Sequence, residues 1–228
     1  KTRIYHIKKE NGSSTLHKID DFISKSALLN DLDVKAADLL QSNGVIWVEG
    51  PSDKVYIKKW LEIFCGNRWK EGRDYQFLYY GGRLLSHYTA DPEQEVEELI
   101  NILLTNRNAA IVMDSDKRYQ SHQINETKKR VRKEFEKNNA FCWITQGKEI
   151  ENYLPKSALE EAYSVTLDKQ CGRYELFSEY IKKALVNFVK VPFSHHVCKY
   201  ITKDNSVDML DLKKQIDRLD KCIESWNK

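Results

Sequence analysis

The sequence predicts an α/β fold: a mostly parallel, four-stranded sheet with helices on both faces, followed by a helical C-terminal lobe. Four short runs rich in β-branched, aromatic and other apolar residues recur along the chain, at residues 45–48, 75–80, 109–113 and 140–145. The segments between these runs have the apolar spacing of amphipathic helices. This alternation is typical of parallel sheets, because parallel neighbours need a crossover connection.

The chain begins with a predicted β-hairpin. An alternating strand at residues 4–7 and a second strand at residues 15–19 flank Asn11-Gly12, a dipeptide typical of tight hairpin turns. Few apolar residues are available to cover this hairpin, so we expect residues 1–24 to be the trailing edge of an upstream domain. The first residue, Lys1, is not a methionine, which agrees with that expectation.

Residues 25–155 are predicted to form the sheet domain, and residues 156–228 the helical lobe. Helices that precede or connect the strands are predicted over residues 21–42, 54–64, about 91–104 and 122–138. The helices predicted after the sheet cover residues 156–164, 174–189, 192–201 and 210–226. We expect this lobe to lie over the carboxyl ends of the strands.

The composition is close to charge balance, with 37 Lys and Arg against 34 Asp and Glu, and a formal net charge of +3. This balance does not by itself establish nucleic-acid binding. The five cysteines are widely spaced and contain no Cys-x-x-Cys pair, which predicts reduced thiols and a cytoplasmic protein. No apolar run approaches the ~20 residues of a membrane helix, so no membrane association is expected.

Carboxylates follow two of the predicted strands. Glu49 comes directly after residues 45–48, with Asp53 one turn into the next helix, and Asp114 and Asp116 follow residues 109–113. Carboxyl ends of parallel strands meet at one edge of a sheet, where ligands bind in α/β folds. Clustered carboxylates suit Mg²⁺ or Mn²⁺, which prefer oxygen ligands. Either motif alone is better explained as a turn or a helix start, whereas the two together favour a metal site.

A third acidic pair, Glu149 and Glu151, follows the strand at residues 140–145. An ordinary charged helix start is the alternative interpretation. Because three of the four strands then end in carboxylates, we favour a role for this pair at the same edge of the sheet.

Two segments are candidate nucleic-acid contacts. Gly81-Gly82-Arg83 follows the strand at residues 75–80, and its glycines can let the backbone approach a phosphate. The run at residues 128–133 is dense in cations, and it is explained more simply as a solvated helix face than as a DNA contact. The candidate DNA-binding residues are Arg83, Lys128, Lys129, Arg130 and Arg132.

The motifs Glu49-Gly50-Pro51-Ser52-Asp53 and Asp114-Ser115-Asp116 resemble the two acidic motifs of a TOPRIM domain. With the string Glu149-Ile150-Glu151-Asn152-Tyr153-Leu154, they resemble the C-terminal TOPRIM region of the overcoming-lysogenization-defect (OLD) nuclease family. The resemblance covers about residues 25–205. It implies a DNA endonuclease that acts in anti-phage defence and forms a homo-oligomer. It also implies an upstream ABC-type ATPase domain, although this chain has no Walker A motif and cannot be assigned ATPase activity itself.

The resemblance implies catalytic roles for Glu49 and Lys190, which would respectively bind metal and neutralise charge on the scissile phosphate. One or two Mg²⁺ or Mn²⁺ ions would be held by Glu49, Asp53, Asp114, Asp116 and Glu151, with Glu149 as the rival of Glu151. The presence of Tyr79 and Tyr80 leaves open an alternative reaction, a topoisomerase-like transesterification in which one of them is the nucleophile. The alternative function is a catalytically silent TOPRIM module that binds DNA or a protein partner.

Overall fold

The structure is a computed structural model that describes residues 42–81, 100–101, 103–104, 106–182, 184–185 and 187–228, together with the backbone of residues 4–10 and 13–19. The helix predicted over residues 21–42 lies almost entirely outside the described residues. Most of the helix predicted at about 91–104 also lies outside them, as does Arg83.

The sheet has four strands, β3 (Val45–Val48), β4 (Gln76–Tyr79), β5 (Ala109–Met113) and β6 (Phe141–Ile144). Their order is β4-β3-β5-β6, and every neighbouring pair is parallel. The prediction of an α/β fold with a four-stranded sheet is therefore confirmed, and the sheet is parallel throughout. After β3 the chain places β4 on one side and β5 and β6 on the other. This change of direction makes the β3–β5 boundary the topological switch point, where α/β sheets open a crevice for ligands.

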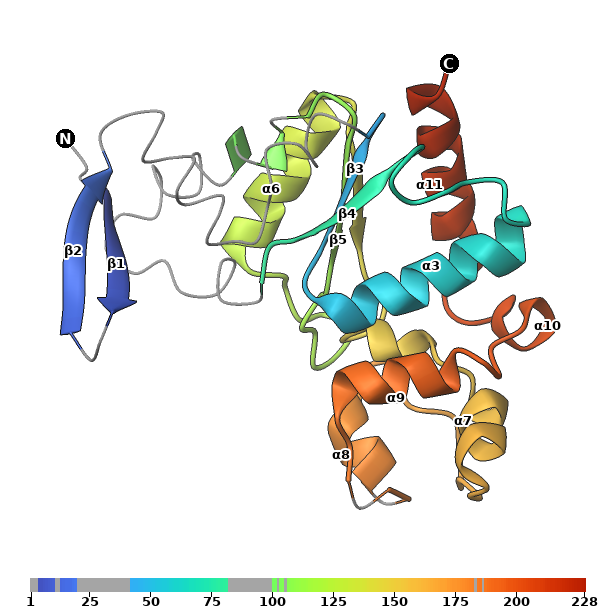
Figure 1. Cartoon of the computed structure of the whole chain (residues 1–228). Helices are drawn as coiled ribbons and strands as arrows, with labels where there is room; N and C mark the ends of the chain where they lie inside the picture. The colour runs from blue at the N-terminus through green and yellow to red at the C-terminus, as the bar shows by residue number, and fades with distance from the viewer. Residues whose placement is uncertain are drawn as a thin grey trace.

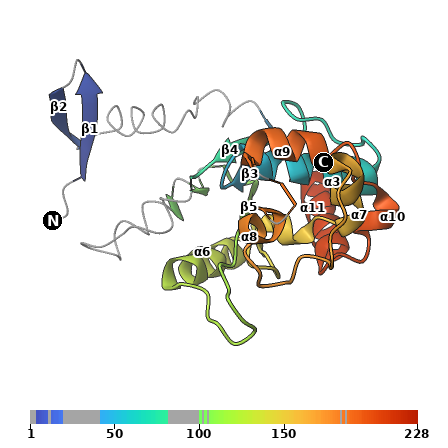
Figure 2. The same cartoon turned by 90° about the horizontal axis from the view of Figure 1, so that it is seen from below.

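Helices cover both faces of the sheet, as predicted (Figures 1 and 2). Alternate side chains of a strand point to opposite faces. Ile46 and Val48 therefore pack with α3 (Pro51–Cys65) and α11 (Leu212–Trp226). Val45 and Trp47 face the other way and join a buried cluster with α6 (Glu126–Lys137).

The N-terminal hairpin consists of β1 (Ile4–Glu10) and β2 (Ser13–Ile19), which pair antiparallel as a separate two-stranded sheet (Figure 1). Its register joins Ile4 to Ile19 and Glu10 to Ser13, so the two strands flank the predicted Asn11-Gly12 turn, which lies outside the described residues.

The segment after β6 supplies several short helices. They are the 3₁₀ helix η1 (Ile150–Tyr153), α7 (Lys156–Tyr163), α8 (Phe177–Lys182), α9 (Lys190–Val197) and α10 (Lys203–Ser206). Figure 1 shows α7, α8 and α9 at the carboxyl ends of the strands. The chain then returns through α11 along the sheet, and Leu212, Ile216 and Leu219 lie in one buried cluster with Ile46. The C-terminal helices and the sheet thus share a core.

One predicted helix is shorter than expected. The apolar spacing predicts a helix over residues 174–189, whereas α8 spans Phe177–Lys182 and residues 187–189 are not helical. The rings of Phe177, Phe188 and Phe193 contact one another, and the centroids of Phe177 and Phe193 lie 5.8 and 4.9 Å from that of Phe188. This packing turns the chain back into α9, so that Lys190 begins a new helix at the edge of the sheet.

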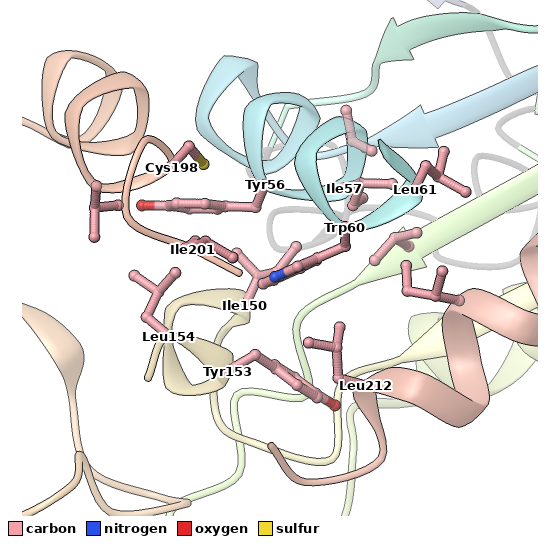
Figure 3. Close-up of a cluster of buried hydrophobic side chains, with 14 of the residues drawn as sticks. Tyr56, Ile57, Trp60, Leu61, Ile150, Tyr153, Leu154, Cys198, Ile201 and Leu212 are labelled. Carbon is pink, nitrogen blue, oxygen red and sulfur yellow. The ribbon is translucent and has the colours of Figure 1, made fainter. Parts of the chain in front are cut away.

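A buried aromatic cluster joins α3 to η1 (Figure 3). Trp60 of α3 lies 6.1 Å from Tyr153 of η1, and Trp143 of β6 lies 5.6 Å from Tyr153, measured between ring centroids. Aromatic pairs at this separation add to the stabilisation from buried area. The cluster holds η1 against the apolar face of α3 and brings the acidic residues of both elements to one place.

Candidate functional site

The first carboxylates of the site come from the β3–α3 junction. Glu49 directly follows β3 and is half-buried. Asp53 lies in the first turn of α3, where its Oδ2 accepts a hydrogen bond of 3.0 Å from the backbone N–H of Gly50. A carboxylate in this position satisfies a free amide at the helix start and is favoured by the helix dipole. The local sequence therefore fixes Asp53 beside the end of β3.

The second acidic segment follows β5. The half-buried Asp114 accepts a hydrogen bond of 2.8 Å at Oδ1 from the backbone N–H of Ile150, which ties it to η1. Ser115 is buried, and its hydroxyl donates to the carbonyl of Gly147 over 2.6 Å. Asp116 is in the left-handed region (φ 55°), which Asp tolerates better than most residues, and its side chain is 68% exposed. Asp114 thus faces the other carboxylates, whereas Asp116 lies at the rim.

The third acidic pair lies at the start of η1, after β6. Glu149 is buried, and its Oε1 accepts from the backbone N–H of Phe177 over 2.7 Å. Glu151 has an exposed fraction of 0%. Neither of its carboxylate oxygens accepts a hydrogen bond from any described residue. A buried carboxylate without hydrogen bonds is costly unless a cation compensates it.

Asn152 organises this acidic segment, a role that the sequence did not reveal. Its Oδ1 accepts from the backbone N–H of Glu149 over 2.8 Å. Its Nδ2 donates to the carbonyls of Gly172 and Glu175, each over 2.9 Å. These buried bonds fasten η1 to the loop before α8 and hold Glu149 and Glu151 in position.

Lys190, the first residue of α9, brings a cation to the site. Its Nζ lies 3.1 Å from Oε1 of Glu151 and 3.4 Å from Oε2 of Glu149, while its side chain remains 47% exposed. Figures 1 and 2 both show α9 alongside α3, which is how residues distant in the sequence meet here. Lys190 begins α9 after the non-helical residues 187–189.

Burial and mutual repulsion raise the pKa values of the acidic groups. Burial, followed by the negative charge of Glu151, raises the pKa of Asp53 to about 7. Burial and the charges of Asp53 and Glu151 raise the pKa of Asp114 well above its usual range. Burial also raises the pKa of Glu49 and of Glu151, although nearby ammonium groups oppose both shifts. The four groups are therefore close enough to repel one another.

The pKa of Lys190 is also raised, but here the rise favours the charged form of the side chain. Burial by itself would lower the pKa of its ammonium, but the charges of Glu151, Glu149 and Asp114 outweigh burial and raise the pKa above its usual range. Lys190 is accordingly held as a cation.

Lys128 belongs to this site and not to a solvated basic surface. Its residue is 5% exposed, and its Nζ donates to the carbonyl of Asp114 over 2.8 Å and contacts the carboxylate of Asp116. The prediction of a solvated face is therefore wrong for Lys128. The spacing contains a signal for its burial, because Lys128 stands three and seven residues before Val131 and Phe135, which are buried on the same helix face.

The other predicted DNA contacts on α6 are more accessible. Lys129 pairs with Glu126 over 2.8 Å and Arg132 with Glu136 over 3.9 Å, as surface pairs of little energetic value. Arg130 lines a surface hollow of about 490 Å³ together with Ile100, Asn101, Lys133, Glu134 and Lys137.

A second basic hollow, also about 490 Å³, lies along α11. Its lining includes the cations Lys213, Lys214, Arg218 and Lys221. This basic stripe was not among the predicted contacts, although its three-to-four-residue spacing is visible in the sequence.

No three carboxylate, histidine or cysteine side chains within the described part of the chain stand in the arrangement of a formed metal site. The hydrogen bonds given above explain this. Backbone N–H groups hold oxygens of Asp53, Asp114 and Glu149, and the Lys190 ammonium lies against Glu151. The residues form a converging acidic cluster that already contains an internal cation.

No family model, curated protein or solved structure matches this chain. The described helices include none that is long and apolar enough to cross a membrane. All five cysteines are free thiols.

Proposed function

We propose that this chain is a divalent-metal-dependent DNA endonuclease of the TOPRIM type. The observation that carries the proposal is the convergence of Glu49 and Asp114, which directly follow the adjacent parallel strands β3 and β5, with Glu151 of η1 at the topological switch point of the sheet. Their raised pKa values reflect a negative cluster that a cation would stabilise.

The residues present fit a hard divalent cation. The fully buried Glu151 has two oxygens without a hydrogen bond from the described residues, and the half-exposed Lys190 ammonium is the cation that lies against it. Glu49, Asp53, Asp114 and Glu151 would hold Mg²⁺ or Mn²⁺. When bound, such an ion supplies Lewis-acid polarisation of a phosphate oxygen and a more acidic water.

Two of the acidic residues suit other roles. Glu149 is held by the N–H of Phe177, so it positions Lys190 and the start of α8. Asp116 lies at the exposed rim and is paired with Lys128, so it would contribute only after that pair opens. Glu151 is therefore favoured over Glu149 as a metal ligand.

Lys190 is suited to contact substrate. Its half-exposed side chain stands at the mouth of the cluster, where the ammonium can neutralise charge that develops on a scissile phosphate. The basic hollows on α6 and α11 would bind the DNA backbone, because phosphate contacts position a duplex without reading its sequence.

The resemblance to OLD-family nucleases extends this proposal to the full protein. It would carry an upstream ABC-type ATPase domain, assemble as a homo-oligomer, and cut DNA in antiviral defence in the cytoplasm.

One observation favours a second candidate, a catalytically silent module that binds DNA or a protein partner. Lys190 already compensates Glu149 and Glu151, so part of the cluster is stable without metal. A silent module needs no further cation.

Cleavage of supercoiled plasmid during titration with MnCl₂ and MgCl₂ tests the proposal. We expect nicked or linear DNA that requires metal, and a loss of at least ~100-fold in rate for Glu49→Gln, which keeps the size of the side chain but removes its charge. Glu62→Gln is the matched control, because Glu62 is exposed on α3. The nuclease assignment is contradicted if the parent cuts no plasmid at any metal concentration. It is also contradicted if Glu49→Gln is folded and cuts as fast as the parent.

A further inference from the structure

The Lys190 ammonium occupies an unusual place, between two buried carboxylates. It lies 3.1 Å from Glu151 and 3.4 Å from Glu149, although its own side chain is nearly half exposed. Apart from this contact with the Lys190 ammonium, neither Oε1 nor Oε2 of Glu151 has a hydrogen-bond partner among the described residues.

The two carboxylates differ in how firmly they are held. Glu149 accepts a hydrogen bond from Phe177 N–H at Oε1, in addition to its contact with Lys190 at Oε2. Glu151 has only the ammonium among the described groups, although it is more deeply buried. Removal of Lys190 would leave Glu151 as an uncompensated buried charge, which is strongly destabilising. Glu151 therefore needs a cation beside it whenever its carboxylate is ionised.

We propose that the Lys190 ammonium is an internal cation that fills the metal position at Glu151, and that a divalent ion binds there by displacing it. This inference rests on the proposed function, because it concerns the loading of the same acidic site.

Displacement follows from electrostatics and from the position of Lys190. An ammonium and a divalent ion that both contact Glu151 would stand within a few ångströms of each other, where like charges in a partly buried site repel strongly. Lys190 can yield because its long, half-exposed side chain leaves the first turn of α9 at the surface. Glu149 and Glu151 cannot yield, because both are buried in η1.

The exchange would couple metal loading to substrate contact. With Glu151 bound to metal, the released ammonium is free on the solvent side of the cluster, where a phosphate would approach. Without metal, the same ammonium is held by carboxylates and is less available to DNA. Lys190 would thus prevent the empty site from carrying its full negative charge and would become available when the site is loaded.

Calorimetric titration of the whole chain with MnCl₂ tests the displacement. Lys190→Met removes the charge and keeps an unbranched side chain, so we expect its Kd for Mn²⁺ to be at least ~10-fold lower than that of the parent. Lys199→Met is the matched control, because Lys199 is exposed shortly after α9. Its Kd should stay within about twofold of the parent value, since exposed charges are screened.

A labelling measurement on the parent protein covers the case in which Lys190→Met does not fold. Acetic anhydride should acetylate Lys190 faster at saturating MnCl₂ than in EDTA, with Lys199 labelled equally in both, as read by peptide mass spectrometry. An unchanged or slower rate at Lys190 overturns the displacement.

The outcomes separate this inference from the proposed function. Metal-dependent cleavage by the parent, with Mn²⁺ binding to Lys190→Met no tighter than to the parent, overturns the displacement and leaves the nuclease proposal intact. If Lys190→Met binds Mn²⁺ and the parent does not, the displacement is supported, even if the parent cuts no plasmid. Binding by neither protein overturns both.

Discussion

Asp53→Asn should make the metal-free protein more stable at neutral pH, although it removes a residue of the candidate metal site. Asp53 lies in the first turn of α3, and its pKa is raised from 3.8 to about 7, first by burial and then by the charge of Glu151. Asparagine retains an oxygen that can accept from Gly50 N–H. The substitution therefore removes mainly the cost of a buried negative charge.

The sign and the size follow from the raised pKa. Between pH 3.8 and about 7 the folded protein keeps a proton on Asp53 that the unfolded chain has lost, so the parent loses stability as pH rises through this window. A rise of about three pKa units corresponds to about 4 kcal/mol. Neutralising Asp53 also lets Asp114 and Glu151 ionise more readily, which takes back part of the gain. We expect a net increase of about 1–3 kcal/mol above pH 7 and almost none near pH 4.

Urea unfolding followed by circular dichroism in EDTA, at pH values from about 4 to 8, measures this difference. Asp208→Asn is the control, because Asp208 is exposed, and its free energy of unfolding should stay within about 0.5 kcal/mol of the parent. With MnCl₂ in place of EDTA the order should reverse, since metal stabilises the parent by mass action and Asp53→Asn binds it less well. A variant less stable than the parent in EDTA at pH 8 would refute the electrostatic reasoning.

Three further substitutions test other parts of the site. Lys128→Met should lower the free energy of unfolding by about 1–3 kcal/mol, because the carbonyl of Asp114 loses its donor. Lys129→Met is the control and should change the free energy of unfolding by less than about 0.5 kcal/mol. Equal effects of the two substitutions in urea unfolding would contradict the burial of Lys128. Asn152→Ala should cost about 2–4 kcal/mol in the same assay, since three buried hydrogen bonds are lost, and a cost below about 1 kcal/mol would count against its organising role. Lys190→Ala should slow plasmid cleavage by roughly 10²–10³ and leave Mn²⁺-induced thermal stabilisation in place, whereas Lys199→Ala should cleave normally; inactivity of the Lys199 variant alone would move the phosphate contact to that residue.

The sequence by itself predicted the strands and the acidic residues that follow them. β3 and β5 begin and end at the predicted residues, because short apolar runs between polar breaks have few other ways to be buried. Glu49 and Asp114 follow these strands directly, so a parallel sheet necessarily brings both to one edge. The convergence of the acidic cluster was therefore predictable from local pattern together with one assumption about the sheet.

The helical segments were less predictable, because apolar spacing does not show where a chain turns. Residues 174–189 have helical spacing throughout, yet α8 ends at Lys182 and the ring contacts of Phe188 with Phe177 and Phe193 accompany the turn of the chain. Those contacts join the two helices α8 and α9 across the turn, and helical spacing alone does not predict them. The turn leaves Lys190 at the start of α9, beside the strand ends.

Only the tertiary structure decided which charged groups are buried. Glu149 and Glu151 look equivalent in the sequence, but the N–H of Phe177 holds Glu149, whereas among the described residues Glu151 has the Lys190 ammonium as its partner. Lys128 lies in a run of cations that looks solvated, but its side chain turns inward to Asp114 and Asp116. The physical reason is the same in both cases. The cost of burying a charge depends on partners supplied by other elements, and the local sequence does not specify those partners.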